Sequence, residues 1–132
     1  MQTGEEKEEK DFQPDISAGG RILPFATLKK RNEFEKLRKK GRVFKNRHLV
    51  LYVLPQEEGN QLRAGFAINK KTGKAFQRNK IRRVLKEILR KVKIPYSIDV
   101  FIIVRHTINE AGFEELKNQL ENSLRQFFQS ER

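Results

Sequence analysis

The stretch GKAFQRNKIRRVLKEILRK, residues 73–91, combines a helical pattern of apolar residues with the densest positive charge in the chain. Apolar residues at spacings i, i+3, i+4, i+7, i+8 and i+11 predict an amphipathic helix, and they are Ile81, Val84, Leu85, Ile88, Leu89 and Val92. The opposite side of the helical wheel carries Asn79, Arg82, Arg83, Lys86 and Arg90, while Arg78 falls near the edge of the stripe. We therefore expect a helix that packs one face on a sheet and presents a row of cations on the other.

Folding stability does not explain this row of cations. Residues 70–93 hold eleven Lys or Arg and a single acid, Glu87, and like charges crowded on one short helix repel each other. The preceding loop, NKKTGK, adds Lys70, Lys71 and Lys74. It also contains Gly73, whose missing side chain allows the backbone to approach phosphates closely. Such a concentration of cations is typical of a surface that binds nucleic acid.

A solvated charged face and a membrane-surface helix are the alternative interpretations of this stretch. The apolar stripe lacks the large aromatic residues of a membrane anchor. Aromatic residues outside the expected core, Phe34, Phe44 and Tyr52, offer stacking surfaces for unpaired bases. Binding of RNA or DNA is therefore the favoured interpretation.

Length and composition are typical of one small basic domain. The chain has 132 residues, a formal net charge of +12 and no cysteine, so disulfides and thiolate metal sites are excluded. No stretch approaches the ~18–20 apolar residues of a membrane span. Residues 1–20 hold six acids and two bases, which predicts a disordered acidic extension, and residues 21–132 are expected to form a single domain. We expect a soluble, cytoplasmic protein.

The remaining patterns predict an α+β fold. A helix is expected near residues 30–40, ended by Gly41, and a short extended piece at residues 42–45. Residues 47–54 and 62–69 are predicted to be strands that form an antiparallel hairpin, and residues 98–104 a strand buried on both faces. A final amphipathic helix starts near residue 110. The expected order is α-β-β-β-α-β-α, with helices on a small, mostly antiparallel sheet.

Residues for catalysis or metal binding do not cluster in this sequence. His48 and His106 are isolated and lack the spacing of a metal motif. Asp99 opens a strand without a second acid near it in sequence, so a two-metal nuclease site is not supported. No glycine-rich loop for a nucleotide is present. We expect neither a metal site nor an active site made by the protein alone.

The stretch NKKTGKAFQRNKIRRVLKEILR resembles the signature of the bacterial ribonuclease P protein subunit. That signature has a Lys-Lys pair, a Gly, an Ala and then a run of basic residues around an Asn on a helix. The matching positions here are Lys70, Lys71, Gly73, Ala75, Arg78, Asn79, Lys80, Ile81, Arg82 and Arg83. The resemblance extends over roughly residues 28–127 and leaves the acidic extension outside.

The resemblance implies an enzyme subunit whose partner is a catalytic RNA. Together they cut the 5′ leader from precursor tRNA, with hydrolysis performed by magnesium ions that the RNA holds. The loop and basic helix would bind the catalytic RNA through Lys70, Lys71, Lys74, Arg78, Asn79, Lys80, Arg82, Arg83, Lys86 and Arg90. Asn79 is expected either to hydrogen-bond to RNA or to hold the loop before the helix; a tolerated surface amide is the alternative.

The resemblance also implies a cleft between the first helix and the sheet that accepts the single-stranded leader. Phe34 and Tyr52 match its positions, and Phe44 is a further candidate. Arg38 stands where relatives often have a second aromatic residue, so that a cation or an arginine plane would replace one stacking ring. Plain core packing is the alternative role of Phe34 and Tyr52. The resemblance further implies that residues 62–69, the basic helix and residues 98–104 form a parallel βαβ unit of the left-handed kind, against the general rule.

The second functional hypothesis is a ribosomal or ribosome-associated RNA-binding protein, which would be a scaffold and not an enzyme subunit. A nuclease that acts without RNA is a third. The sequence does not distinguish the subtype of catalytic RNA, the oligomeric state or the role of the acidic extension. Restored leader cleavage in a mixture with the catalytic RNA separates the first hypothesis from the other two.

Overall fold

The computed structural model describes residues 20–130, so the predicted acidic extension lies, except for Gly20, outside the described residues. Three α-helices and a five-stranded sheet make up this part of the chain, together with two 3-10 turns. In order they are β1 (Phe25–Thr27), α2 (Arg31–Lys40), β2 (Arg42–Lys45), β3 (Leu49–Pro55), β4 (Leu62–Ile68), η1 (Lys70–Thr72), α3 (Ala75–Lys91), β5 (Ile98–Val104), η2 (His106–Glu110) and α4 (Phe113–Ser130). The predicted α+β class and the predicted order of elements are confirmed, with β1 as an additional strand.

The sheet is mixed, with strand order β1-β4-β5-β3-β2. β1 and β5 each pair in parallel with β4, while β3 pairs antiparallel with both β5 and β2. The prediction of a mostly antiparallel sheet is therefore wrong, because half of the four pairings are parallel. The first of these parallel pairs was missed because β1 has only three residues, too few for a periodic pattern.

The predicted hairpin of β3 and β4 is also wrong. β5 lies between these two strands, and Ile102 is the register partner of Leu51 on one side and Phe66 on the other. The chain leaves β4, crosses through α3 and returns parallel to β4, which needs a long connection and gives β5 the central place. This central position explains why the sequence of β5 is apolar on both faces.

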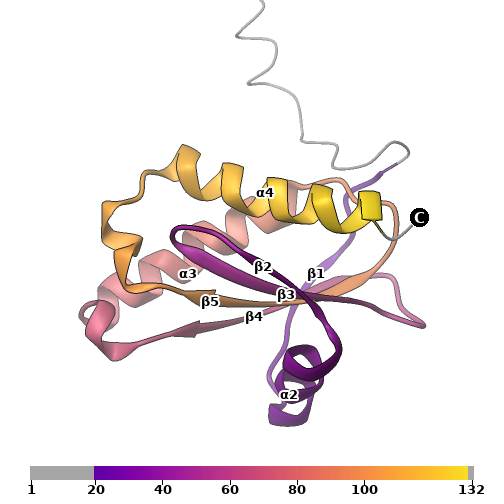
Figure 1. Cartoon of the computed structure of the whole chain (residues 1–132), viewed down its shortest axis with the longest axis horizontal. Helices are drawn as coiled ribbons and strands as arrows, with labels where there is room; N and C mark the ends of the chain where they lie inside the picture. The colour runs from indigo at the N-terminus through magenta and orange to yellow at the C-terminus, as the bar shows by residue number, and fades with distance from the viewer. Residues whose placement is uncertain (1–19, 131–132) are drawn as a thin grey trace, which may run out of the picture.

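The two faces of the sheet are covered differently. α3 and α4 lie across one face, and the much shorter α2 lies on the other (Figure 1). The main core fills the space under α3 and α4 and includes Leu51, Ile102, Leu89 and Leu124, all buried. Beneath α2 a smaller cluster of buried residues contains Leu28, Leu37 and Phe101.

Candidate RNA-binding surfaces

The amphipathic pattern of α3 is confirmed by its packing. Leu85, Ile88 and Leu89 are buried against the main core, and Ile81 and Val84 are partly buried beside it. The predicted polar side of the helix faces away from this core, with Asn79, Lys80, Arg83 and Arg90 exposed and Arg78, Arg82 and Lys86 partly exposed. The helix therefore presents its cations along one side, as the wheel predicts.

The loop before α3 continues this charged side. Lys70, Lys71 and Lys74 are all exposed. The η1 turn that carries the first two is capped by Asn69, whose side-chain oxygen accepts a hydrogen bond from the Lys71 backbone N–H at 2.8 Å. At the start of α3 the Gln77 side-chain oxygen accepts from the Lys74 backbone N–H at 2.7 Å. These caps hold the loop in one conformation next to the helix.

Gly73 makes room for the cap of α3. Its backbone is extended, with φ 164° and ψ −174°, and a Cβ atom built on it would overlap the Gln77 side-chain oxygen. A close approach of this backbone to a phosphate of the RNA stays a prediction.

Asn79 is bonded within α3 itself. Its side-chain oxygen accepts from the Arg82 guanidinium at 3.0 Å, so it orients a cation of the next helical turn. The alternative prediction, that Asn79 holds the preceding loop, is wrong, because Asn109 of η2 does so instead. The Asn109 side-chain amide donates to the backbone oxygen of Thr72 at 2.8 Å. Sequence reasoning missed Asn109, since it lies more than thirty residues from the loop.

The cations of the loop and α3 lack acidic partners. Within residues 20–130, none of the Lys and Arg between 70 and 93 takes part in an ion pair. Arg78 differs from the others, because its Nε atom is buried without a hydrogen-bond partner. An unpaired row of this kind is free to neutralise an external polyanion. We name Lys70, Lys71, Lys74, Arg78, Asn79, Lys80, Arg82, Arg83, Lys86 and Arg90 together the α3 surface.

A second surface lies on the opposite face of the sheet, where α2 stands beside β4 and β5. A groove of about 360 Å³ opens there, and Phe34, Arg38, Ala67 and Phe101 are among its lining residues. The Phe34 ring packs on Phe101 with 4.9 Å between the ring centroids, and Tyr52 stacks on the other side of Phe101 at 6.2 Å. Phe34, Arg38 and Phe101 line the groove, and Tyr52 adjoins it through its contact with Phe101. We call the surface made of these four residues the α2 groove.

The structure brings three of the four predicted cleft residues together. Phe34 and Tyr52 are half-buried and Arg38 is exposed. The prediction for the fourth residue, Phe44, is wrong, because Phe44 is partly buried against the main core. The centroids of the Phe44 and Phe127 rings are 6.4 Å apart. The strand register explains the error. Val43 is the register partner of Tyr52, so these two residues lie on the same face of the sheet. Phe44, the next residue along β2, therefore lies on the opposite face.

Ion pairs fasten α2 to the sheet beside the groove. The Arg63 guanidinium of β4 donates to both oxygens of Asp99 on β5, each at 2.8 Å, and to Glu33 of α2 at 3.1 Å. The hydrogen bond to Asp99 raises the pKa of Arg63 above its ordinary value. Asp99, the acid near the start of β5, is therefore a structural partner of Arg63. Through Arg63, which also bonds to Glu33, it helps to position α2.

Comparisons with known proteins show which family this chain resembles. A family model described as ribonuclease P matches residues 24–127. The ribonuclease P protein component of Bacillus pumilus is 37% identical over 100 residues, which cover 74% of this chain and 84% of that protein. The ribonuclease P protein of Thermotoga maritima is similar in structure, with a TM-score of 0.65, 27% identity and coverage of 76% of this chain and 96% of that one. A mutant Staphylococcus aureus RNase P protein with defective mRNA degradation activity gives a TM-score of 0.65 at 32% identity, covering 73% and 82%.

This chain belongs to the ribonuclease P protein family. The match includes the α3 surface, the α2 groove and the whole sheet. The resemblance stated from the sequence is confirmed, and the comparisons do not favour a ribosomal protein. As a ribonuclease P protein component, the chain is part of a ribonucleoprotein endoribonuclease that cleaves precursor tRNA.

The two histidines of this ribonuclease P protein lie in or beside η2. His48 is fully buried just before β3, where its Nδ1 lies 2.8 Å from the Thr107 hydroxyl and its Nε2 lies 3.1 Å from a Glu115 carboxylate oxygen. It joins η2 and α4 to the sheet. His106 is exposed in η2.

In residues 20–130 no group of three or more His, Cys, Asp or Glu side chains is suited to a metal ion. Nor is any helix of that part long and apolar enough to cross a membrane.

Proposed function

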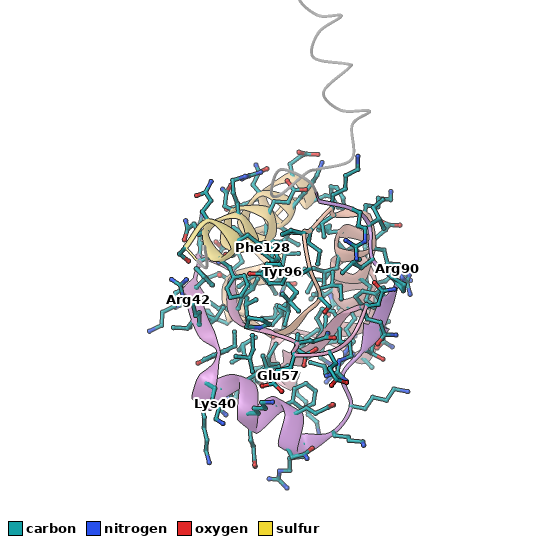
Figure 2. All side chains as sticks on the ribbon, turned by 90° about the vertical axis from the view of Figure 1, so that its right-hand side faces the viewer. Lys40, Arg42, Glu57, Arg90, Tyr96 and Phe128 are labelled. Carbon is teal, nitrogen blue, oxygen red and sulfur yellow. The ribbon has the colours of Figure 1, made fainter. Side chains whose placement is uncertain are left out.

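We propose that the α3 surface binds the catalytic RNA of ribonuclease P and that the α2 groove holds the 5′ leader of precursor tRNA. The observation that carries this assignment is the separation of two chemically different surfaces by the sheet. One surface consists of unpaired cations, and the other has aromatic rings around an open groove. Figure 2 labels Arg90 of α3 and Lys40 of α2, and the two side chains point away from different sides of the molecule.

The α3 surface suits a folded RNA because its cations follow a straight helix of 17 residues. Each phosphate that a Lys or Arg neutralises releases condensed counterions, and this release drives association. Folded RNA crowds phosphates on its exterior, so a row of cations with fixed spacing matches it. The caps of η1 and α3 keep Lys70, Lys71 and Lys74 in place, which lowers the entropy lost on binding.

The α2 groove suits single-stranded RNA because unpaired bases stack on partly exposed rings, and Phe34 and Tyr52 are half-buried. Phe34 and Tyr52 flank Phe101, so that three rings form a continuous apolar strip on this face of the sheet. Stacking of one base on an aromatic residue stabilises a complex by ~1–3 kcal/mol. Arg31 and Arg38 line the same groove together with Glu35, which forms an ion pair with Arg31 at 3.8 Å. The positive charge of Arg38 would therefore be the one that faces the phosphates of the leader. The sequence of the leader would matter little, because every base has a π face.

In this account the protein supplies binding and the RNA supplies catalysis. Hydrolysis of the phosphodiester requires metal ions that activate water and stabilise the leaving oxygen. We assign these magnesium ions to the catalytic RNA, as the resemblance implies. The proposed cellular location of the protein is the cytoplasm, where precursor tRNA would be the substrate.

Reconstitution tests the proposed function directly. The full chain is mixed with a bacterial ribonuclease P RNA and precursor tRNA at a magnesium concentration too low for the RNA alone to cleave. Leader removal only in the complete mixture is the expected result. Cleavage by the protein without RNA would overturn the assignment of catalysis to the RNA, and no cleavage by the mixture would overturn the proposed partnership.

A further inference from the structure

A hollow lies beside the first turns of α3, next to the α3 surface and apart from the α2 groove. It has a volume of about 500 Å³ and lies between α3, η2 and the start of α4. Its lining is mainly apolar and includes Phe76, Ile81, Val84, Ile108, Phe113 and Leu116. Lys80 lines its edge, and no acid is among its lining residues. The hollow therefore combines an apolar floor with a positive edge.

The two exposed phenylalanines of residues 20–130 both line this hollow. Phe76 is 69% exposed and Phe113 is 47% exposed. Every other phenylalanine in the described part of the chain is buried or half-buried. Single exposed apolar residues are common on proteins and need no explanation. Two exposed rings from different helices at the edges of one hollow are a different case, because water-exposed apolar surface is concentrated at one place.

Folding does not require Phe76 at its position. It is the second residue of α3, outside the buried stripe of that helix, and phenylalanine is a poorer helix former than the straight-chain residues. Leu85, Ile88 and Leu89 already anchor α3 to the core. The ring of Phe76 thus adds exposed apolar surface at the start of the helix and gains little packing in return.

We infer that this hollow binds an unpaired base of the catalytic RNA, stacked on Phe76 and covered by Phe113. The inference rests on the proposed function and adds a site to the α3 surface. Charge favours this occupant: Lys80 and Arg83 follow Phe76 at spacings of four and seven residues, on the same side of the helix. A base in the hollow would place its own phosphate and the neighbouring ones beside these two cations. Stacking supplies the apolar contact, and the cations hold the backbone.

The leader is not the expected occupant, because the α2 groove lies on the other face of the sheet (Figure 1). The hollow instead adjoins the α3 surface, since Lys80 belongs to both that surface and the lining of the hollow. Asn109 lines the hollow and also bonds to the η1 turn. This bond connects the wall of the hollow to the loop that carries Lys70 and Lys71.

The first test compares Phe76→Ala, Phe113→Ala and Arg83→Ala in binding of the full chain to catalytic RNA over a series of salt concentrations. Loss of base stacking should weaken binding by about five-fold to a hundred-fold for each phenylalanine variant. The slope of log affinity against log salt should stay unchanged for them, because stacking releases no counterions. Arg83→Ala is the matched control, and it should flatten that slope.

Phe76→Leu separates stacking from simple apolar contact, because leucine keeps an apolar side chain and removes the π face. We expect it to bind as weakly as Phe76→Ala, and wild-type affinity would overturn the inference. Phe76→Trp introduces a single tryptophan, since the chain has none, and its emission can be excited selectively beside the two tyrosines. Its emission should be quenched when catalytic RNA is added without precursor tRNA. Val43→Trp, at an exposed position on β2, is the control and should not respond.

Three outcomes contradict this site in different ways. If the wild-type chain does not bind catalytic RNA, the proposed function itself fails. If it binds and Arg83→Ala is weaker while both phenylalanine variants bind normally, only the base-binding hollow fails. Self-association that depends on Phe76, measured by sedimentation, together with normal RNA affinity, would assign the hollow to a second copy of the chain instead.

Discussion

The ring of Phe34 lies directly on the backbone of Gly65. A Cβ atom built on Gly65 would stand only 2.7 Å from the Phe34 Cζ atom, so glycine is the residue that lets α2 approach β4 this closely. The same ring packs on Phe101 on its other side. The shape of the α2 groove therefore depends on a strand position without a side chain.

Gly65→Ala should displace Phe34 and loosen α2. Because the ring is held by Phe101 and the overlapping atoms belong to a stiff aromatic, we expect overpacking to lower the free energy of unfolding by ~1–3 kcal/mol. Urea denaturation measures this. Gly112→Ala is the control, because a Cβ atom there has no neighbour within 4 Å. An equal loss in both variants would contradict the packing of Phe34 on Gly65.

Replacing Arg82, Arg83 and Lys86 together by Ala should weaken binding to the catalytic RNA and leave the fold intact or more stable. These side chains have no acidic partners in the described residues, and their removal relieves repulsion within α3. The slope of log affinity against log salt should flatten by ~0.7–0.9 for each lost phosphate contact. Unchanged affinity and slope would mean that this side of α3 does not face RNA.

Asn79→Ala should reduce RNA affinity by roughly 1–2 kcal/mol if its hydrogen bonds are formed in the complex. The structure adds a specific expectation, because Asn79 accepts from Arg82. In a double-mutant cycle with Arg82→Ala the two losses should be less than additive. Full additivity would show that Asn79 acts independently of Arg82. No effect on binding or on thermal melting would leave Asn79 as a surface amide.

Glu121 on α4 should make stability depend on pH. Burial raises the pKa of this carboxyl above its ordinary value of 4.5, and one of its oxygens is buried without a hydrogen-bond partner. Folding therefore favours the protonated carboxyl. Below the unfolded-state pKa the carboxyl is protonated in both states, so Glu121 does not lower the free energy of unfolding. The loss of stability grows as the pH rises toward the folded-state pKa and stays constant above it.

Glu121→Gln should consequently stabilise the fold at pH 7 and give no such gain at a pH below the pKa of an unfolded glutamate. Thermal or urea unfolding at the two pH values measures the difference. Glu87→Gln removes the same charge at an exposed position of α3 and serves as the control. A stabilisation by Glu121→Gln that is equal at both pH values would contradict a raised pKa.

Local patterns predicted the elements of this fold better than their pairing. The stripe of α3 and the bounds of β5 follow from residues adjacent in sequence. The place of β5 between β3 and β4 depends on how α3 packs across the sheet, and no local signal contains this. For the same reason the face on which Phe44 lies required the register of β2 with β3.

The site was predictable in the same uneven way. Cations gathered along one helix are visible in the sequence, so the α3 surface was predicted residue by residue. Phe101 was not, because a phenylalanine in an apolar strand gives no sign that one of its faces borders a groove. Phe76 and Phe113 come from elements far apart in sequence and meet only through the fold.

The central claim, that the α2 groove holds the leader while α3 holds the catalytic RNA, is tested by comparing precursor and mature tRNA. Phe34 and Tyr52 also pack on Phe101, so their replacement by Ala is expected to lower the melting temperature to some degree. Phe34→Leu keeps most of this packing and removes the ring, which makes it the companion variant. Assembly with the catalytic RNA should be unaffected by each change.

The deciding measurement is the affinity of the reconstituted holoenzyme for precursor tRNA and for mature tRNA, with Phe34→Ala, Phe34→Leu or Tyr52→Ala in place. Loss of one stacked base should weaken precursor binding by about ten-fold or more for each variant and leave mature tRNA binding unchanged. Equal losses for the two tRNA forms, together with a lower melting temperature, would contradict the account and assign both rings to core packing alone.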